Sequence, residues 1–282
     1  MIRCRMLFAS TALAARIERA EARLVGDSAL AAARRRPGTG AFAMPISGGI
    51  ATFTAPGSPL NKLAGLGFGG PLDPGELEAV ERAFAERGVP VQVELGCLAD
   101  PSIAALLTRR GYTLENFENV LGRRLPIEAT IAPPAGLAVS ESTADERAAW
   151  LDLMLAGFAS PDTEGVPSHE SFLRDELERV MADMAEVEGF VRYLARKEGI
   201  PAGGASMRLF DGIAQLCGAA TLPEHRRRGV QGALLATRLE LAGRARCDVA
   251  IVTTQPGSKS QQNAQKQGFE LLYTRAILVR QP

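Results

Sequence analysis

The residues best suited to chemistry lie in one short loop, residues 221–235, which is predicted to connect a strand to a helix. Pro223 ends the strand, and Gly229 and Gly232 are expected to expose backbone N–H groups at the positive end of the helix, where phosphate oxygens bind. Three arginines at positions 226–228 add positive charge and fork-shaped donors that suit a diphosphate. The alternative interpretation is a solvated surface turn whose glycines only shape the start of the helix.

Other signatures of phosphate or metal chemistry do not accompany this loop. The sequence contains no GxxxxGK(S/T), and no GxGxxG lies within residues 221–235, which excludes the two common nucleotide-binding loops at this position. The cysteines form no CxxC pair, and the only histidines are His169 and His225. We therefore expect no metal site and no disulfide framework.

Charge and composition favour a small ligand. Lysine plus arginine and aspartate plus glutamate both number 32, so no overall field attracts a polyanion, and nucleic-acid binding has no support. A hydrophobic fraction of 46% over 282 residues is enough for one large or two ordinary domains. We expect a globular protein, monomeric or homodimeric, that binds a small molecule or a peptide.

The N-terminal segment has two interpretations. Arg3 and Arg5 precede an apolar run at residues 6–15, which faintly resembles a secretory signal. The run continues through Ile17, Ala20 and Leu24 with charged residues between them, which favours one amphipathic helix. No apolar run approaches the roughly 20 residues that a membrane span needs. A cytoplasmic protein without membrane contact is the expectation.

The second half of the chain predicts an α/β fold, in which α+β layers form a mixed central sheet flanked by helices. Helices are expected at residues 144–158 and 168–183, followed by strands at 190–197, 203–209 and 213–222. After the loop come a helix at 230–243, a strand at 249–254, a helix at 258–267 and a strand at 276–279.

The first half repeats part of this order. A helix at 75–87, a strand at 89–95 and a helix at 102–110 precede Gly111, as their counterparts precede Gly268. Val91 and Val249 are 158 positions apart, and the two glycines 157. Because residues 125–138 are rich in proline and poor in core residues, we predict two tandem domains, 1–125 and 139–282, joined by a linker at 126–138.

Together the loop and its surroundings resemble the coenzyme-binding motif of GNAT N-acetyltransferases. The family pattern is (Q/R)-x-x-G-x-(G/A), followed downstream by N…G-F, and this chain has R-R-R-G-V-Q-G at 226–232 and N-A-Q-K-Q-G-F at 263–269. Arg226 and Gly229 match the pattern, whereas Gln231 stands where the family has Gly or Ala. The resemblance covers about residues 140–280. It implies acetyl-CoA as co-substrate and an amine of a small molecule or peptide as acceptor.

The resemblance also implies a set of coenzyme-binding residues. Backbone groups at the strand end would pair with the pantetheine arm, and the amides of residues 227–232 would hold the pyrophosphate. For Asn263, an ordinary helix-surface amide is an equal alternative to a ligand contact. The full set is Thr221, Leu222, Arg226, Arg227, Arg228, Gly229, Val230, Gln231, Gly232, Ala233 and Asn263.

The catalytic residues are not apparent from the sequence. The family commonly uses a strand carboxylate and a tyrosine on the helix before G-F, but here Ala264 stands four residues before Gly268. Positioning alone is one explanation. Weak candidates for the acid and base are Tyr273, Glu164, His169 and Cys217, each of which has a structural alternative as a packed or solvated residue.

Two further segments bear on function. Residues 157–167 lie where the family places the acceptor wall, with Trp150, Phe158 and Phe172 as lining or core residues. Residues 65–74 in the first half are glycine-rich but lack arginine and contain two prolines, which indicates a degenerate repeat without a cofactor loop. The alternatives to an enzyme are a non-catalytic acyl-CoA-binding or regulatory module and a purely structural protein.

Overall fold

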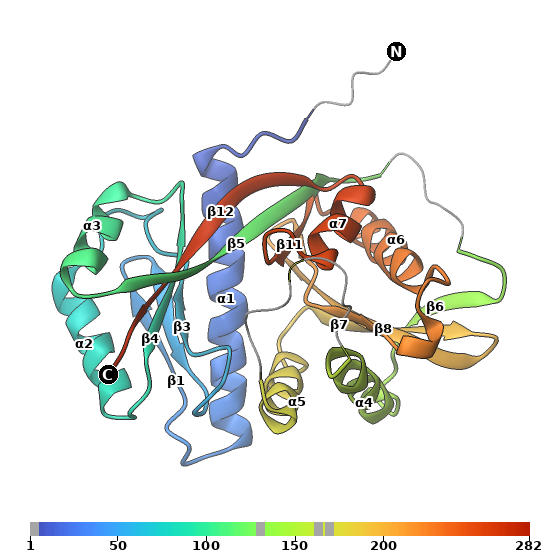
Figure 1. The fold of residues 1–282 in the computed structure, drawn as a ribbon, viewed down its shortest axis with the longest axis horizontal. Helices are drawn as coiled ribbons and strands as arrows, with labels where there is room; N and C mark the ends of the chain where they lie inside the picture. Colours follow the sequence, from blue (N-terminus) through green and yellow to red (C-terminus); the bar gives the residue numbers. More distant parts are fainter. Residues whose placement is uncertain (1–5, 128–132, 161–165, 167–171) are drawn as a thin grey trace. The chain divides into compact units, whose positions relative to one another are not determined.

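The computed structural model describes residues 6–127, 133–160, 166 and 172–282. The chain forms two compact units. The first-half unit contains Phe8–Val120 together with Leu271–Pro282, and the second-half unit contains Leu121–Glu270, with Leu7 ahead of the first helix. Each unit is built on strands with helices packed against them (Figure 1).

The first-half unit places strands in the order β1-β2-β3-β4-β12-β5. Its core is made mainly of aliphatic and phenylalanine side chains from α2, α3 and these strands. The elements are α1 (Thr11–Arg35), β1 (Phe42–Ile46), β2 (Gly49–Phe53), β3 (Lys62–Ala64), α2 (Pro74–Ala85), β4 (Val91–Gly96), α3 (Pro101–Arg109), β5 (Thr113–Arg124) and β12 (Glu270–Arg280).

Helix α1 confirms the expected amphipathic helix but begins later than the apolar run. Ser10 caps it by accepting a hydrogen bond from the backbone N–H of Leu13 at 3.1 Å. Met6 and Phe8, which the apolar run included, precede the helix and are exposed. Ile17 and Ala20 are buried on its inner face.

The second-half unit orders its strands β5-β11-β9-β8-β7-β6, with β10 paired to β8. Figure 1 shows β7 and β8 between α6 on one side and α4 and α5 on the other. The elements are β6 (Leu137–Glu141), α4 (Arg147–Phe158), α5 (Arg174–Met184), β7 (Phe190–Lys197), β8 (Ile200–Phe210), β9 (Ile213–Gln215), β10 (Ala219–Thr221), the short 3₁₀ helix η1 (Pro223–His225), α6 (Val230–Arg244), β11 (Val249–Thr254) and α7 (Lys259–Lys266).

One sequence expectation in this unit was wrong, and another stays a prediction. The stretch expected to be poor in core residues has a buried leucine near each end, Leu125 and Leu137, and Leu137 begins β6 by pairing with Lys197 of β7. The strand expected at 213–222 is two strands, β9 and β10, because the chain changes register between them. Of the expected linker, residues 128–132 lie outside the described residues.

The internal repeat has a clear structural counterpart. Strands β4 and β11 have the same length, and each is followed by a helix and by a glycine with positive φ, 85° at Gly111 and 75° at Gly268. The next residue turns back identically: Tyr112 N–H donates to Leu107 O, and Phe269 N–H to Ala264 O. The mixed α/β fold is therefore confirmed in both units.

The compact units do not follow the two halves of the sequence. Strand β12 comes last in the chain, yet its residues from Leu271 onward belong to the first-half unit, where β12 pairs with β4 from Arg275↔Gly96 to Arg280↔Val91. The end of β5 belongs in turn to the second-half unit, and Leu125 N–H bonds to Asp248 O. We call β12 the exchanged strand, because it ends the second sequence repeat but belongs from Leu271 onward to the first-half unit, whereas β5 contributes to both units. The domain boundary at 126–138 stays a prediction about the repeat.

Candidate functional site

A β-bulge separates β9 from β10, which would otherwise form one continuous strand paired with β8. Strand β9 pairs with β8 through Arg208↔Gln215, and β10 resumes through Ala205↔Ala219, which shifts the register by one residue. Gly218 takes the left-handed conformation, with φ of 87°, that this bulge needs. Strand β11 pairs in parallel with β9 as far as Ile251, but its end diverges from β10.

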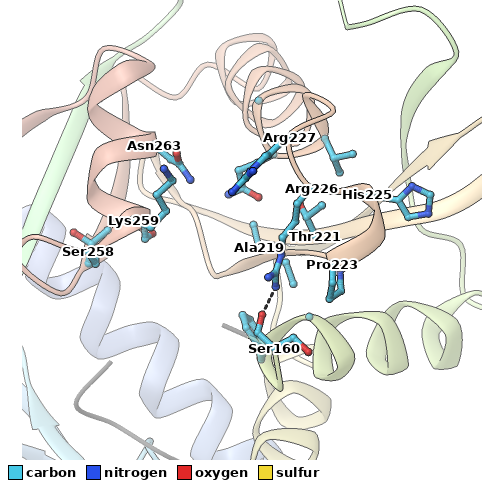
Figure 2. Close-up of a pocket in the computed structure, with 18 of the residues that line it drawn as sticks. Ser160, Ala219, Thr221, Pro223, His225, Arg226, Arg227, Ser258, Lys259 and Asn263 are labelled. Carbon is cyan, nitrogen blue, oxygen red and sulfur yellow. Dashed lines mark hydrogen bonds between the residues drawn. The ribbon is translucent and has the colours of Figure 1, made fainter. Parts of the chain in front are cut away.

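The divergence of β10 and β11 opens a cavity of about 930 Å³ in the second-half unit. Its walls come from both strand ends, the loop before α6, the C-terminal end of α4 and the start of α7 (Figure 2). The lining includes Phe158, Ser160, Ala219, Thr221, His225, Arg226, Arg227, Gly229, Val230, Gln231, Gly232, Thr253, Thr254, Ser258, Lys259 and Asn263.

The loop presents the uncapped start of α6 to this cavity. The amides of the turn Pro223–His225 are occupied by hydrogen bonds within the turn, since His225 N–H bonds to Leu222 O at 2.9 Å. Gly229 occupies the N-cap position of α6, with φ of 81° and no side chain to bond the first amides. Ala233 N–H is bonded to Gly229 O at 3.0 Å. In the part of the chain that the structure describes, nothing caps the preceding amides, from Val230 to Gly232, and these residues line the cavity, which makes the amides suitable donors to an anion.

Glycine is suited to positions 229 and 232 of the loop for different physical reasons. A Cβ at Gly229 would lie 2.7 Å from Pro134 Cγ, and the positive φ also disfavours other residues there. A Cβ at Gly232 would meet only Gln267 Nε2, at 3.8 Å. Gly229 is therefore needed for the backbone and its packing, whereas Gly232 leaves open space at the cavity wall.

Positive side chains surround the same opening. Arg226 is half-buried and donates to Ser160 O, which ties the loop to the end of α4 (Figure 2). Arg227 is exposed at the cavity, and Figure 2 shows Asn263 and Lys259 facing it from α7. This concentration of positive charge beside uncapped amides suits a polyanionic group such as a diphosphate.

Buried polar atoms without partners lie along the cavity wall. Among the described residues, Thr221 Oγ1, Thr254 Oγ1 and His225 Nδ1 are buried and accept or donate no hydrogen bond. Leaving such atoms unpaired costs about 1–3 kcal/mol each, so a polar ligand in the cavity would relieve that cost. Leu222 N–H bonds to Ala202 O of β8; because backbone groups alternate along a strand, those of Ala219 and Thr221 point toward the cavity.

Most residues of the expected coenzyme-binding set line the cavity, but three do not. Leu222 is bonded to the sheet through its amide, and Ala233 is buried in the core beneath α6. Arg228 is exposed and absent from the lining. The sequence did not predict that Ala219, Thr254, Ser258 and Lys259 line the cavity. For three of them a signal was available, since Thr254 ends the strand expected at 249–254 and Ser258 and Lys259 begin the next expected helix.

The weak catalytic candidates are not brought together. Tyr273 belongs to the first-half unit, where its hydroxyl donates to Glu18 Oε1 at 2.6 Å and burial raises its pKa far above the usual value. Cys217 lies on the bulge with its thiol 3.4 Å from Gln215 O, and neither residue lines the cavity. Glu164 and His169 lie outside the described residues.

The other aromatic and helix residues also have defined places. Trp150 is buried and donates to Ala205 O at 3.1 Å, so it belongs to the core, whereas Phe158 lines the cavity. Ala264 is buried in the core. Within the described ranges no cluster of histidine, cysteine or carboxylate residues fits a metal ion. No helix in those ranges combines the length and hydrophobicity of a membrane span.

Comparison with known proteins agrees with this site. Residues 154–269, which contain the bulge, the loop and the cavity, match the acetyltransferase (GNAT) family. The chain therefore carries a GNAT acetyltransferase domain. The fold of this family supports acyl-CoA-dependent acetyl transfer, and its members use acetyl-CoA and act on amine acceptors.

Solved structures resemble the whole chain in fold. A GCN5-related N-acetyltransferase from Kribbella flavida is 22% identical over 96% of each chain, with a TM-score of 0.67. A tandem GNAT protein from the clavulanic acid biosynthesis pathway is 12% identical over 98% of this chain and 97% of that one, with a TM-score of 0.60. A GCN5-related N-acetyltransferase from Sphaerobacter thermophilus is 15% identical, covering 95% and 93%, with a TM-score of 0.55. A comparison with curated protein sequences gave no match.

Proposed function

We propose that this chain is an acetyl-CoA-dependent N-acyltransferase that transfers an acetyl group to an amine of a small molecule or a peptide. One observation carries the proposal: the uncapped start of α6 and the gap between β10 and β11 open into the same cavity. A diphosphate needs the first feature, and an extended arm with amide groups needs the second.

The residues present fit acetyl-CoA. The amides from Val230 to Gly232, with Arg226 and Arg227, would hold the diphosphate. The pantetheine arm would take its hydrogen bonds from the backbone of Ala219 and Thr221 and satisfy the buried hydroxyls of Thr221 and Thr254. Bound there, acetyl-CoA supplies an acetyl group activated as a thioester.

Amine attack requires a neutral amine, and the described residues of the cavity wall include neither a carboxylate nor a tyrosine. The general base and the general acid therefore stay unassigned, with Glu164 of the segment 157–167 one of the weak candidates, and Asn263 is proposed for a coenzyme contact. Without a general acid, a thiolate leaving group with a pKa of about 8.5 still departs near neutral pH. The protein's contribution is then mainly orientation and exclusion of water.

Buried Ala264, in place of the family's tyrosine, favours a second candidate function, a non-catalytic acyl-CoA-binding or regulatory module. Both candidates bind acetyl-CoA, but only an enzyme releases free CoA thiol when a suitable amine is added. A screen of small amines and peptide N-termini, read by thiol release, separates them.

Calorimetric titration with acetyl-CoA tests the site itself. Gly232→Asp should weaken binding at least tenfold, because the new carboxylate enters open space beside the diphosphate amides. Gly232→Ala separates the effect of volume from that of charge. Gln265→Asp is the matched control, since Gln265 is exposed on α7 outside the cavity lining and should leave the affinity unchanged. Absence of binding to the wild type would refute both candidate functions.

In the proposed function, the first-half unit is a degenerate GNAT repeat that supports the second-half unit without a cofactor of its own. The protein works in the cytoplasm as a monomer or homodimer. Equilibrium sedimentation, with and without acetyl-CoA, measures the oligomeric state directly.

A further inference from the structure

Arg238 is a buried arginine of α6 whose partners are backbone carbonyl groups. Its side chain is 2% exposed. Its Nε donates to Leu234 O at 3.1 Å, and its Nη1 donates to Ser206 O at 2.9 Å and to Gly218 O at 3.4 Å. Buried arginines are usually paired with carboxylates, so three carbonyl acceptors in the described structure are an unusual use of this charge.

The charge persists at neutral pH. Burial lowers the pKa of Arg238 to about 10, and the nearby Cys217 thiol and Tyr193 hydroxyl partly oppose that effect. The side chain is therefore a cation at pH 7, enclosed next to the bulge. Its field acts on the neighbouring peptide groups with little screening by water.

The acceptors of Arg238 belong to the bulge. Ser206 of β8 exchanges hydrogen bonds with both bulge residues: its carbonyl accepts Cys217 N–H at 3.1 Å, its amide donates to Gly218 O at 3.1 Å, and its hydroxyl donates to Cys217 O. Arg238 bonds to the two carbonyls at the centre of this arrangement. It therefore holds the register shift that separates β10 from β11.

The peptide between Gly218 and Ala219 connects Arg238 to the cavity. Its carbonyl accepts hydrogen bonds from Arg238 and Ser206, and its N–H points the opposite way because the peptide is trans. Ala219 lines the cavity, where its N–H faces the gap. Hydrogen bonding of a carbonyl to a cation polarises the whole amide and strengthens its N–H as a donor.

We propose that Arg238 is a positioning residue that fixes the bulge and polarises the Gly218–Ala219 peptide, so that Ala219 N–H becomes a strong donor to a thioester carbonyl in the cavity. This inference rests on the proposed function. It assigns a specific task to a residue that never touches the ligand. A merely structural arginine would stabilise the unit without altering the bound carbonyl.

The test compares three substitutions by calorimetry with acetyl-CoA and with ADP, which has the diphosphate but no pantetheine arm. Arg238→Met should lower the acetyl-CoA affinity about tenfold, the effect of losing a charge-assisted hydrogen bond, and leave ADP affinity unchanged. Arg238→Lys should recover part of the loss. Arg208→Met is the matched control, because Arg208 is equally buried but donates to Glu188 O.

A spectroscopic measurement separates positioning from stability. Infrared difference spectra of acetyl-CoA labelled with ¹³C at the acetyl carbonyl should show the bound carbonyl stretch at lower frequency in the wild type and in Arg208→Met, and a smaller shift in Arg238→Met. If Arg238→Met fails to fold, Arg238→Gln, which keeps donors but not the charge, is measured instead. An unchanged carbonyl shift in the folded variant overturns the inference, whereas a wild type that binds no acetyl-CoA refutes the proposed function.

Discussion

Helices α2 and α6 occupy matching positions in the two sequence repeats, but they begin in opposite ways. In α2, Asp73 caps the helix by accepting Glu76 N–H at 2.8 Å, and Pro74 removes another amide. In α6, Gly229 offers no side chain, and the first amides face the cavity. A few residues thus decide whether a helix start stabilises itself or remains available to an anion.

The two units also differ in where their charged side chains lie. The first-half unit pairs them internally: Arg275 is 1% exposed and lies 2.7 Å from Glu18 and 3.6 Å from Glu94, and Lys62 bonds to Glu94. The second-half unit directs Arg226, Arg227 and Lys259 toward its cavity. The repeated framework is common to both units; buried ion pairs stabilise the first-half unit, whereas the proposed function assigns the cavity arginines of the second-half unit to binding of the diphosphate.

The largest effect should come from removing the exchanged strand. Deleting residues 271–282 leaves β4 and β5 without the strand between them and strips buried Glu18 of Arg275 and Tyr273. We expect the first-half unit not to fold, because an uncompensated buried charge alone costs about 3–5 kcal/mol. Circular dichroism and urea unfolding measure the loss. Deleting only the exposed residues 281–282 is the control and should leave stability unchanged.

Gly232→Glu would give α6 the acidic first turn of α2, since Glu76 and Gly232 occupy corresponding places three residues after the N-cap. We expect acetyl-CoA affinity to fall at least tenfold while the free energy of unfolding rises by about 1 kcal/mol, from higher helix propensity and the helix dipole. Calorimetry and urea unfolding on the same sample check both signs. A parallel loss of stability would contradict the idea that α6 trades stability for binding.

Glu118 should make the first-half unit sensitive to pH. Burial raises its pKa to about 7, with help from nearby Glu94 and against the pull of Lys62 and Arg275. Because the pKa of Glu118 is higher in the folded protein than its unfolded value near 4.5, the contribution of Glu118 to folding stability is fully present below pH 4.5. That contribution is lost as the pH rises through 7. Glu118→Gln should therefore gain stability relative to the wild type, by about 1–2 kcal/mol, between pH 5 and 8. Thermal unfolding across that range provides the measurement, and a flat difference would count against it.

The smallest effect concerns the closed helix start. Asp73→Ala should cost about 1 kcal/mol of unfolding free energy, because the cap on Glu76 N–H is lost. Acetyl-CoA affinity should stay the same, since the cavity belongs to the second-half unit. Any gain of a second acetyl-CoA site in this variant would show that the cap alone silences the first repeat.

Local patterns in the sequence predicted most elements, including the strand at 249–254, because apolar periodicity and Gly or Pro stops are encoded over a few residues. The loop at 226–232 was also predictable, since its chemistry lies in contiguous residues. The exchange of β12 was not, because pairing Arg275 with Glu18 joins residues far apart in the chain. The bulge was missed because Cys217 and Gly218 interrupt a strand-like run too briefly to signal a register shift.

The exchanged strand also imposes an order on folding during synthesis. A ribosome produces the residues of α1, β1 to β5, α2 and α3 first, but the strand that fills the gap between β4 and β5 is made only after the whole GNAT domain. The first-half unit therefore cannot complete its sheet, or pair Glu18 with Arg275, until translation has passed residue 275. A complete first-half unit forms only after the acetyltransferase domain has been synthesised in full.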